Sequence, residues 1–468
     1  MAIGKRIGDR QEELWIATAD LARSAGHPFY EQVNRLLAEA RFDEYVEKLC
    51  AKFYAGTVGR PGVPPGVYVR MLLVGYFEGI DSERGIAWRC SDSLSLRSFV
   101  GLTLSESPPD HSTVSRTRRL IDLETHVEIF SFVLKLLAER GHLSGKTIGV
   151  DATTLEANAA MKSLVRRDSG QSYQDFLVEL AKASGIETPT RADLARIDRK
   201  RAKKGSNDDW HNPNDPDAQI TKMKDGRTHL AHKAEHAVDM DSGAVMAVRI
   251  HPGAAGDTST LPETMLATAE SIATLKEDLD IEAKLGDAAL SEWVADKGYH
   301  SNEVLVAIEC AGWRTYISEP DRGRRKWNGN EEARHAVHAN RRRIRGRRGR
   351  ELLRKRGERI ERTFAHCLET GRMRRAHLRG RENIEKRYLI HVAAYNLGIL
   401  MRAILGKGTP RGLQGRMAAL LAACSRIIHI LMNVHFSFPL FSGPIAFQSP
   451  ARSAPLSCGG IRLFTTGC

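Results

Sequence analysis

The stretch Lys146-Thr-Ile-Gly-Val-Asp-Ala-Thr-Thr-Leu155 decides the fold. It is short, apolar and rich in β-branched residues, which is typical of a buried strand. Residues 229–238 and 244–250 alternate in polarity around the turn Asp239-Met-Asp-Ser-Gly243, and this pattern predicts a β-hairpin. Helices and strands are then expected in turn at 259–272, 293–295, 302–311 and 314–318. A hairpin followed by alternating helices and strands predicts an α/β or α+β layer with a mixed sheet.

Helices are expected both before and after this layer in the sequence. Before it, we predict helices over 29–54, 67–78, 82–88 and 111–121. After it, two long helices are expected at 351–368 and 384–405, and a tail beyond Val434 without acidic residues is expected to be poorly ordered. The predicted organisation is an all-α domain over 1–125, an α/β domain over 140–410 with a polar, partly helical insertion at 156–227, and a C-terminal helix and tail over 411–468.

Composition limits the possible classes of protein. The 468 residues are 42% apolar, which is enough for several domains with a sizeable core and excludes a mainly disordered chain. The longest apolar run, 417–434, is interrupted by Arg426 and His429, which argues against a membrane span. Seven scattered cysteines form no CxxC pair, and the first residues lack the apolar stretch of a signal peptide. We therefore expect a reduced, cytoplasmic protein without a membrane partner.

The positive charge is concentrated in one segment. The chain carries a net charge of +13, and residues 322–362 hold 17 lysines and arginines against five glutamates. A concentrated basic segment predicts a polyanionic partner, and nucleic acid is the default candidate because neutralised phosphates release counterions. The predicted helix at 111–121 is also basic, with Arg116, Arg118 and Arg119 expected to be exposed. It suits a helix-turn-helix-like DNA-binding domain, although a helical bundle with a solvated basic face explains the same pattern.

Three carboxylates stand out by their placement. Asp151 lies inside the apolar strand, where an unpaired carboxylate would cost several kcal/mol. Asp296 follows the strand at 293–295, and Glu361 lies beside the inward Ile360 of a basic helix. Carboxylates on adjacent strand ends and a facing helix can hold two divalent ions about 4 Å apart, which is the arrangement used for phosphodiester displacement. Hard oxygen ligands of this kind favour Mg²⁺ or Mn²⁺.

The same residues lie in blocks that resemble a known family. Gly149-Val-Asp-Ala-Thr-Thr154, Ala295-Asp-Lys-Gly-Tyr-His300 and Glu358-Arg-Ile-Glu-Arg-Thr-Phe364 resemble the three catalytic blocks of bacterial insertion-sequence DDE transposases. Ala394-Tyr-Asn-Leu-Gly398 is similar to that family's C-terminal block, and Pro109-Asp-His-Ser-Thr-Val-Ser-Arg116 to its N-terminal helical domain. The resemblance covers about residues 25–410. It implies a ribonuclease-H-like catalytic domain preceded by an all-α domain, metal-dependent cutting and joining of transposon ends, and a homo-oligomer assembled on double-stranded DNA.

The resemblance assigns Asp151, Asp296 and Glu361 as catalytic ligands of two Mg²⁺ or Mn²⁺ ions. Glu358, three residues before Glu361, competes for the third place, and the register of the block favours Glu361. Some relatives carry Tyr, Arg and Lys where this chain has Arg354, Gly357 and Leu368. The predicted DNA contacts are Arg116, Arg118, Arg119, Lys297, Arg324, Arg325, Trp327, Arg341, Arg342, Arg345, Arg359 and Arg362.

Several other patterns have plainer interpretations. Asp239 and Asp241 are expected to be turn residues, and Asp257 a helix N-cap. The spacing of His229, His232 and His236 suits zinc on a helix, but on the predicted strand 229 and 232 face opposite sides. His338, Arg341 and Tyr388 imitate part of a tyrosine recombinase, and Trp327 is either a base-stacking residue or a loop anchor. A non-catalytic DNA-binding protein remains the alternative function.

Overall fold

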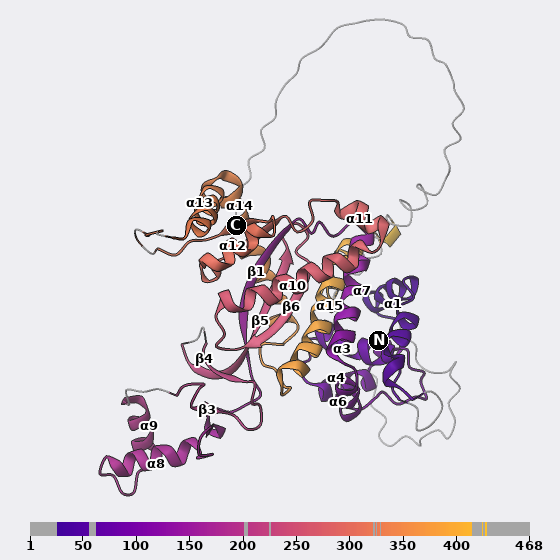
Figure 1. Cartoon of the computed structure of the whole chain (residues 1–468). Coiled ribbons are helices and arrows are strands. Elements are labelled where there is room, and N and C mark those ends of the chain that lie inside the picture. Colours follow the sequence, from indigo (N-terminus) through magenta and orange to yellow (C-terminus); the bar gives the residue numbers. More distant parts are fainter. Residues whose placement is uncertain are drawn as a thin grey trace, which may run out of the picture.

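The computed structural model describes residues 26–55, 62–200, 205–223, 226–321, 323, 325–327, 329–413, 424 and 426–427. A group of helices at the N-terminal side packs against a mixed sheet that carries helices of its own (Figure 1). The mixed α/β architecture predicted from the sequence is therefore confirmed. The predicted C-terminal tail lies outside the described residues.

The N-terminal helices form a compact layer. They are α1 (Pro28–Glu39), α2 (Phe42–Cys50), η1 (Ala51–Phe53), α3 (Pro65–Glu78), α4 (Glu83–Asp92), α5 (Leu94–Val100), α6 (His111–Leu120) and α7 (Leu123–Glu139). The single helix predicted over 29–54 is divided, because Arg41 adopts a left-handed conformation with φ of 55° between α1 and α2. Ser82 caps α4 as expected, with its hydroxyl accepting from the Gly85 N–H.

The sheet is built around the strand that was predicted first. Its strands are β1 (Thr147–Glu156), β4 (Gln219–Lys222), β5 (Thr228–Asp239), β6 (Val245–Pro252), β7 (Glu292–Ala295) and β8 (Arg314–Ile317). Their order is β4-β5-β1-β7-β8, and β6 also pairs with β5. The hairpin strands β5 and β6 are antiparallel, whereas β1, β7 and β8 run parallel to one another. The carboxyl end of β7 therefore lies beside the middle of β1, which pairs with β7 through Gly149 and continues to Glu156.

Helices cover both faces and one edge of this sheet. They are α10 (Asp257–Lys276), α11 (Leu279–Leu285), η3 (Lys297–Tyr299), α12 (Asn302–Cys310), α13 (Glu331–Arg345), α14 (Arg347–Phe364), the π-helical turn η4 (Ala365–Thr370), α15 (Arg381–Leu405) and η5 (Pro410–Leu413). The α14 helix crosses β1 closely because Gly149 has no side chain: a Cβ there would lie 3.1 Å from the Ile360 side chain. Thr260 and Thr264 of α10 bond Glu235, which lies on the other face of β5.

The helix α15 joins the sheet to the N-terminal helices. It lies between the two in Figure 1 and packs against α3, α7 and β6. Its length and composition would allow it to cross a membrane, but 72% of the apolar window is buried inside the protein. Arg387 is fully buried and donates to the backbone oxygens of Leu72 and Ile80. We conclude that α15 is a core helix.

The polar insertion carries a small core of its own. It contains η2 (Met161–Ser163), β2 (Val165–Arg166), α8 (Tyr173–Ala183), α9 (Arg191–Lys200) and β3 (Trp210–His211). Leu164, Trp210 and Leu230 are the larger buried side chains of this core. The lobe projects away from the sheet at the lower left of Figure 1. The partly helical character predicted for the insertion is confirmed by α8 and α9, and Ser172 caps the first of these helices.

Candidate active site

Asp151 lies in the middle of β1 and is held by two groups. Its Oδ1 accepts from the Ala152 N–H at 2.8 Å, and its Oδ2 accepts from Nη1 of Arg356 at 2.8 Å. Burial raises the pKa of the Asp151 carboxyl above its ordinary value, the Arg356 guanidinium opposes this rise, and the nearby Asp296 carboxylate adds to it. The strand register agrees with this effect: Asp151 and Asp296 each lie two residues beyond the paired Gly149 and Val294, on neighbouring parallel segments.

Asp296 follows β7 directly and begins the turn that was expected there. Its carboxylate accepts from the Gly298 N–H at 2.8 Å, which caps η3. Gly298 lies between two acids, since a side chain at this position would clash with the carboxylates of Asp257 and Asp296. The next residue, Tyr299, is buried and donates its hydroxyl to Glu235 at 2.8 Å. The turn is thus fixed at both ends.

Glu361 is exposed on α14 and, within the described part of the chain, forms no hydrogen bond or ion pair with either aspartate. It follows Ile360, whose side chain packs on Gly149, two residues before Asp151. The competing acid, Glu358, is exposed and pairs with Arg362 one turn later at 2.8 Å. Within the described residues, no group of three or more His, Cys, Asp or Glu side chains could hold a metal ion. The structure therefore assembles the two aspartates but not the complete triad.

The hard oxygen ligands that Mg²⁺ requires are present at the sheet edge in Asp151 and Asp296. A positive charge, Arg356, balances the partly buried Asp151 carboxylate. This donor set fits a divalent cation chemically once a third oxygen ligand approaches. Glu361 is the acid on α14 that adjoins the contact with β1.

The expected exposure of one predicted DNA contact is wrong. Arg118 is not exposed on α6 but only 4% accessible, and it forms an ion pair with Glu83 of α4. It also lies 3.4 Å from the Asn383 side chain of α15. The helix α6 turns this position inward between α4 and α15. Arg116 and Arg119 are exposed as expected.

The predicted DNA contacts outside α6 divide into residues with structural partners and residues that are exposed. Arg341 makes a bidentate contact with Glu319 at 2.5 and 2.7 Å, and Arg325 is also near Glu319, at 3.7 Å. Arg359 is partly buried beside Gly243 of the hairpin. Trp327 is half-buried against the core and contacts Arg325 and His338, which favours the loop anchor. Lys297, Arg342, Arg345 and Arg362 are exposed, and Arg324 lies outside the described residues.

Within the part of the chain that the structure describes, the histidines of β5 belong to no group that could hold zinc. His232 lies 3.2 Å from Asp215. His236 contacts the hydroxyl groups of Thr363 and Tyr388, each at 3.0 Å. Tyr388 is fully buried, as its core-facing position on the helix predicted, so the recombinase interpretation loses its nucleophile.

The remaining acids have structural partners. Asp239 is buried and accepts from Ser144 and Ser242, and Asp241 pairs with Lys355 at 2.9 Å, so the expected turn roles are confirmed. The N-cap predicted at Asp257 is wrong. Gly256 occupies that position without a side-chain cap, and the Asp257 carboxylate accepts from Nζ of Lys233 at 2.6 Å. The Asp257 carboxylate therefore serves as the counter-ion of the buried Lys233 ammonium instead of capping the helix, because a buried charge without a partner is costly.

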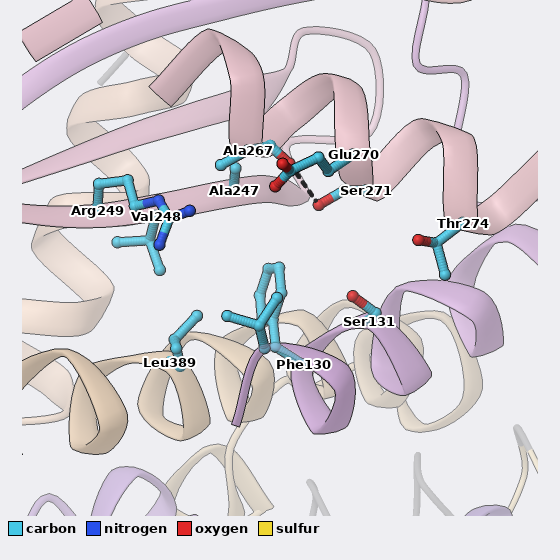
Figure 2. Close-up of a pocket in the computed structure, with 11 residues that line it drawn as sticks. Phe130, Ser131, Ala247, Val248, Arg249, Ala267, Glu270, Ser271, Thr274 and Leu389 are labelled. Carbon is cyan, nitrogen blue, oxygen red and sulfur yellow. Dashed lines mark hydrogen bonds between the residues drawn. The ribbon is translucent and has the colours of Figure 1, made fainter. Parts of the chain in front are cut away.

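A small cavity of about 50 Å³ lies elsewhere, between α7, β6, α10 and α15 (Figure 2). Phe130, Val248 and Leu389 form its apolar wall, and Arg249, Glu270 and Ser271 supply polar groups. Its lining includes none of the predicted site residues. We therefore assign the candidate active site to the edge of the sheet at Asp151 and Asp296 rather than to this cavity.

Two family models match the chain. Residues 18–120 match a model described as "Transposase domain (DUF772)", and residues 190–397 match one described as "Transposase DDE domain". The chain belongs to the insertion-sequence DDE transposases. The first match spans the helices α1 to α6 of the transposase, and the second includes Asp296 and Glu361. Asp151 lies between the two matched segments. Comparison with curated proteins and with solved structures gives no match.

Sequence reasoning did not single out three residues that shape the transposase site. Arg356 was counted within the basic segment, although it lies four residues before the inward Ile360 and hence on the same helix face. Lys233 and Glu235 lie on one face of a strand that was predicted only as an arm of the hairpin. Lys233 and Glu235 alternate with His232 and His236, so polar side chains lie on both faces of β5. This pattern was a sign that protein covers both faces of the strand.

Proposed function

We propose that this transposase cleaves the ends of a mobile element and joins them to target DNA, with Asp151, Asp296 and Glu361 as metal ligands. The observation that supports this proposal best is the register of β1 and β7: Asp151 and Asp296 each follow by two residues the paired Gly149 and Val294, and the charge of Asp296 raises the pKa of Asp151. Asp296 also lies just after the carboxyl end of β7, and residues at such strand ends often contact ligands. The strand order and the helices on both faces favour the ribonuclease-H-like class.

A pair of Mg²⁺ or Mn²⁺ ions, when bound, would activate water or a 3′-hydroxyl and stabilise the leaving oxygen. The protein itself supplies position and charge. The Gly298 N–H fixes the Asp296 carboxylate, and the Tyr299–Glu235 hydrogen bond anchors the turn below it. Ile360 packs α14 against β1 at Gly149, two residues before Asp151, and Glu361 is the next residue on this helix.

Exposed basic residues form the surface on which DNA is proposed to approach this site. Arg116 and Arg119 on α6 are proposed to contact the transposon end, and Lys297 follows the metal-ligand turn. Arg342, Arg345 and Arg362 on α13 and α14 are proposed to hold phosphates, because arginines bind them with little sequence preference. We also propose the domain division at 1–125, 140–410 and 411–468, a cytoplasmic, nucleoid-associated location and an oligomer assembled on DNA.

The proposal is tested by nicking of a cognate DNA end in Mg²⁺ or Mn²⁺. We expect wild-type protein to cleave, and Asp151→Asn, Asp296→Asn and Glu361→Gln to lose cleavage by a factor of about 10³ or more. Glu358→Gln is the matched control on the same helix and should retain cleavage. If Glu358→Gln loses activity and Glu361→Gln does not, the third ligand is assigned to the wrong glutamate.

A DNA-binding protein that has lost cleavage is the second candidate. The absence of a gathered three-residue acidic group within the described chain favours it. Both candidates bind DNA in a salt-sensitive way, so binding does not separate them. Wild-type protein that nicks no more than Asp151→Asn in either metal would establish the second candidate.

A further inference from the structure

Trp88 on α4 is the one exposed aromatic residue in the part of the chain that the structure describes. It is 65% exposed, whereas the other described tryptophans, tyrosines and phenylalanines are buried or half-buried. Ile86, Ala87 and Cys90 form the buried face of the helix, so Trp88 lies on its outer face. An exposed indole ring offers a large apolar surface, and the groups around it indicate which partner covers it.

Arg84 shares this outer face with Trp88. The two residues are one helical turn apart, and both are exposed. Nη2 of Arg84 lies 3.3 Å from Nε2 of His111, the first residue of α6. Among the described residues, Arg84 forms no ion pair with a carboxylate. Its positive charge is therefore available to a partner.

The arginines of α6 add to the same positive surface. Arg116 and Arg119 are exposed, and within the described ranges their side chains bond only serines one turn earlier on α6. Two other arginines of these helices are neutralised by glutamates, Arg89 by Glu78 at 3.1 Å and Arg118 by Glu83. The uncompensated charges are thus those of Arg84, Arg116 and Arg119.

The helices α4 and α6 are packed side by side. They are neighbours in Figure 1, and the buried ion pair between Glu83 and Arg118 joins them. Asp92, one turn beyond Trp88 on α4, is exposed and carries the opposite charge, so it bounds the positive surface at that end of the helix. Arginines bind phosphates, and aromatic rings contact bases. This combination of groups fits nucleic acid.

We propose that α4 shares the DNA-binding surface of α6, with Arg84 on a phosphate and the Trp88 indole against deoxyribose and base edges of double-stranded DNA. This inference rests on the proposed contact of Arg116 and Arg119 with the transposon end, and it adds an apolar contact to that interface. A second copy of this chain is a poorer partner for the surface, because it would bring the same uncompensated arginines against it.

The experiment is fluorescence anisotropy of a labelled duplex that carries a transposon end, measured with the full chain over a salt series. Trp88→Ala should weaken binding about tenfold and leave the salt dependence unchanged, because an apolar contact releases no counterion. Arg84→Ala should reduce the slope of log binding constant against log salt by about 0.9, the value for one phosphate contact. Leu279→Ala, on α11 and 77% exposed, is the control for loss of an exposed apolar side chain and should bind as wild type does.

Two further variants keep the test valid if Trp88→Ala folds poorly. Trp88→Phe retains an aromatic ring and should lose less affinity than Trp88→Ala. Asp92→Asn should bind DNA about twofold more tightly than wild type, because it removes a negative charge near the phosphates, and a misfolded protein would not gain affinity. Asp280→Asn removes the same charge from an exposed position on α11 and should leave binding unchanged.

The outcomes separate this inference from the proposed function. If Trp88→Ala and Asp92→Asn bind as wild type does while Arg116→Ala binds more weakly, the α6 contact stands and the role of α4 is overturned. If the arginine variants of both helices bind as wild type does, the proposed DNA contact of α6 fails and the inference fails with it. If Trp88→Ala leaves DNA binding unchanged but lowers the mass of the DNA-free protein in light scattering, Trp88 belongs to a protein interface and the inference is wrong.

Discussion

Asp151 on β1 lies directly opposite His236 on β5 in the register of the sheet. Opposed residues of antiparallel strands share one face, so the site carboxylate and this imidazole both face α14. His236 contacts Thr363 of α14 and Tyr388 of α15. The strand pair that carries Asp151 is thereby bonded to the helix that carries Glu361, and this network fixes where α14 crosses the sheet.

The hydroxyl group of Tyr388 is predicted to stabilise this hydrogen-bond network and to take no part in DNA cleavage. Tyr388→Phe removes the 3.0 Å contact with His236 and should lower the free energy of unfolding by about 1–2 kcal/mol, which urea denaturation would measure. DNA cleavage should continue, and denaturing gels should show no covalent protein–DNA adduct in wild type or variant. An adduct that is present in wild type and lost in Tyr388→Phe would restore the recombinase interpretation.

The buried histidines are predicted to make the fold acid-sensitive. Burial lowers the pKa of His236 to about 3, from the ordinary value of 6.5. Below pH 6.5 the unfolded chain takes up a proton that the folded chain does not, so stability is complete above pH 6.5 and falls as the pH decreases. At pH 5 the loss from one such histidine is about 2 kcal/mol.

His236→Gln should therefore reduce the difference between the unfolding free energies at pH 7.5 and pH 5. Burial also lowers the pKa of His126 to about 4 and of His391 to about 3, so part of the acid sensitivity should persist. His111→Gln, at an exposed position, is the control and should leave the difference unchanged. An equal pH dependence in wild type and His236→Gln would show that His236 is not buried as a neutral group.

The three arginines of α6 are predicted to have different roles, one in the stability of the fold and two in DNA binding. Arg118→Ala leaves Glu83 buried without its partner and should destabilise the fold by about 3–5 kcal/mol. Arg116→Ala and Arg119→Ala should change stability by less than about 0.5 kcal/mol and weaken DNA binding. Thermal denaturation and a gel shift on the same samples would test this. Stable Arg118→Ala protein with weakened DNA binding would contradict the division.

Elements with strong local signals could be predicted from the sequence. The strand at 146–155, the hairpin at 229–250 and the capped helices at Ser82 and Ser172 have periodicity or capping that acts within a few residues. The split at Arg41 could not be predicted, since a left-handed arginine is fixed by packing of α1 and α2. The helix α7 went unpredicted although its apolar positions are helical in period.

The residue types of the site could be predicted from the sequence, but the ion pair between Asp151 and Arg356 could not. Asp151 was expected to need a partner or a metal, and the partner that the structure supplies is Arg356, distant in sequence. Arg118 looked exposed because its neighbours are charged, but tertiary packing of α4 and α15 decides which side of α6 is buried. Such choices depend on contacts between distant segments, which a linear pattern does not contain.

The exposed arginines of α13 are predicted to carry phosphate contacts. Arg342→Ala combined with Arg345→Ala should reduce the slope of log binding constant against log salt by up to about 2, because each lost phosphate contact removes about 0.9. The double variant Lys48→Ala and Lys284→Ala removes the same charge from exposed positions on α2 and α11 and should leave the slope unchanged. Fluorescence anisotropy of labelled duplex DNA over a salt series gives both slopes. If the two double variants reduce the slope equally, overall charge rather than the α13 surface drives binding, and the proposed path of the DNA across this helix is wrong.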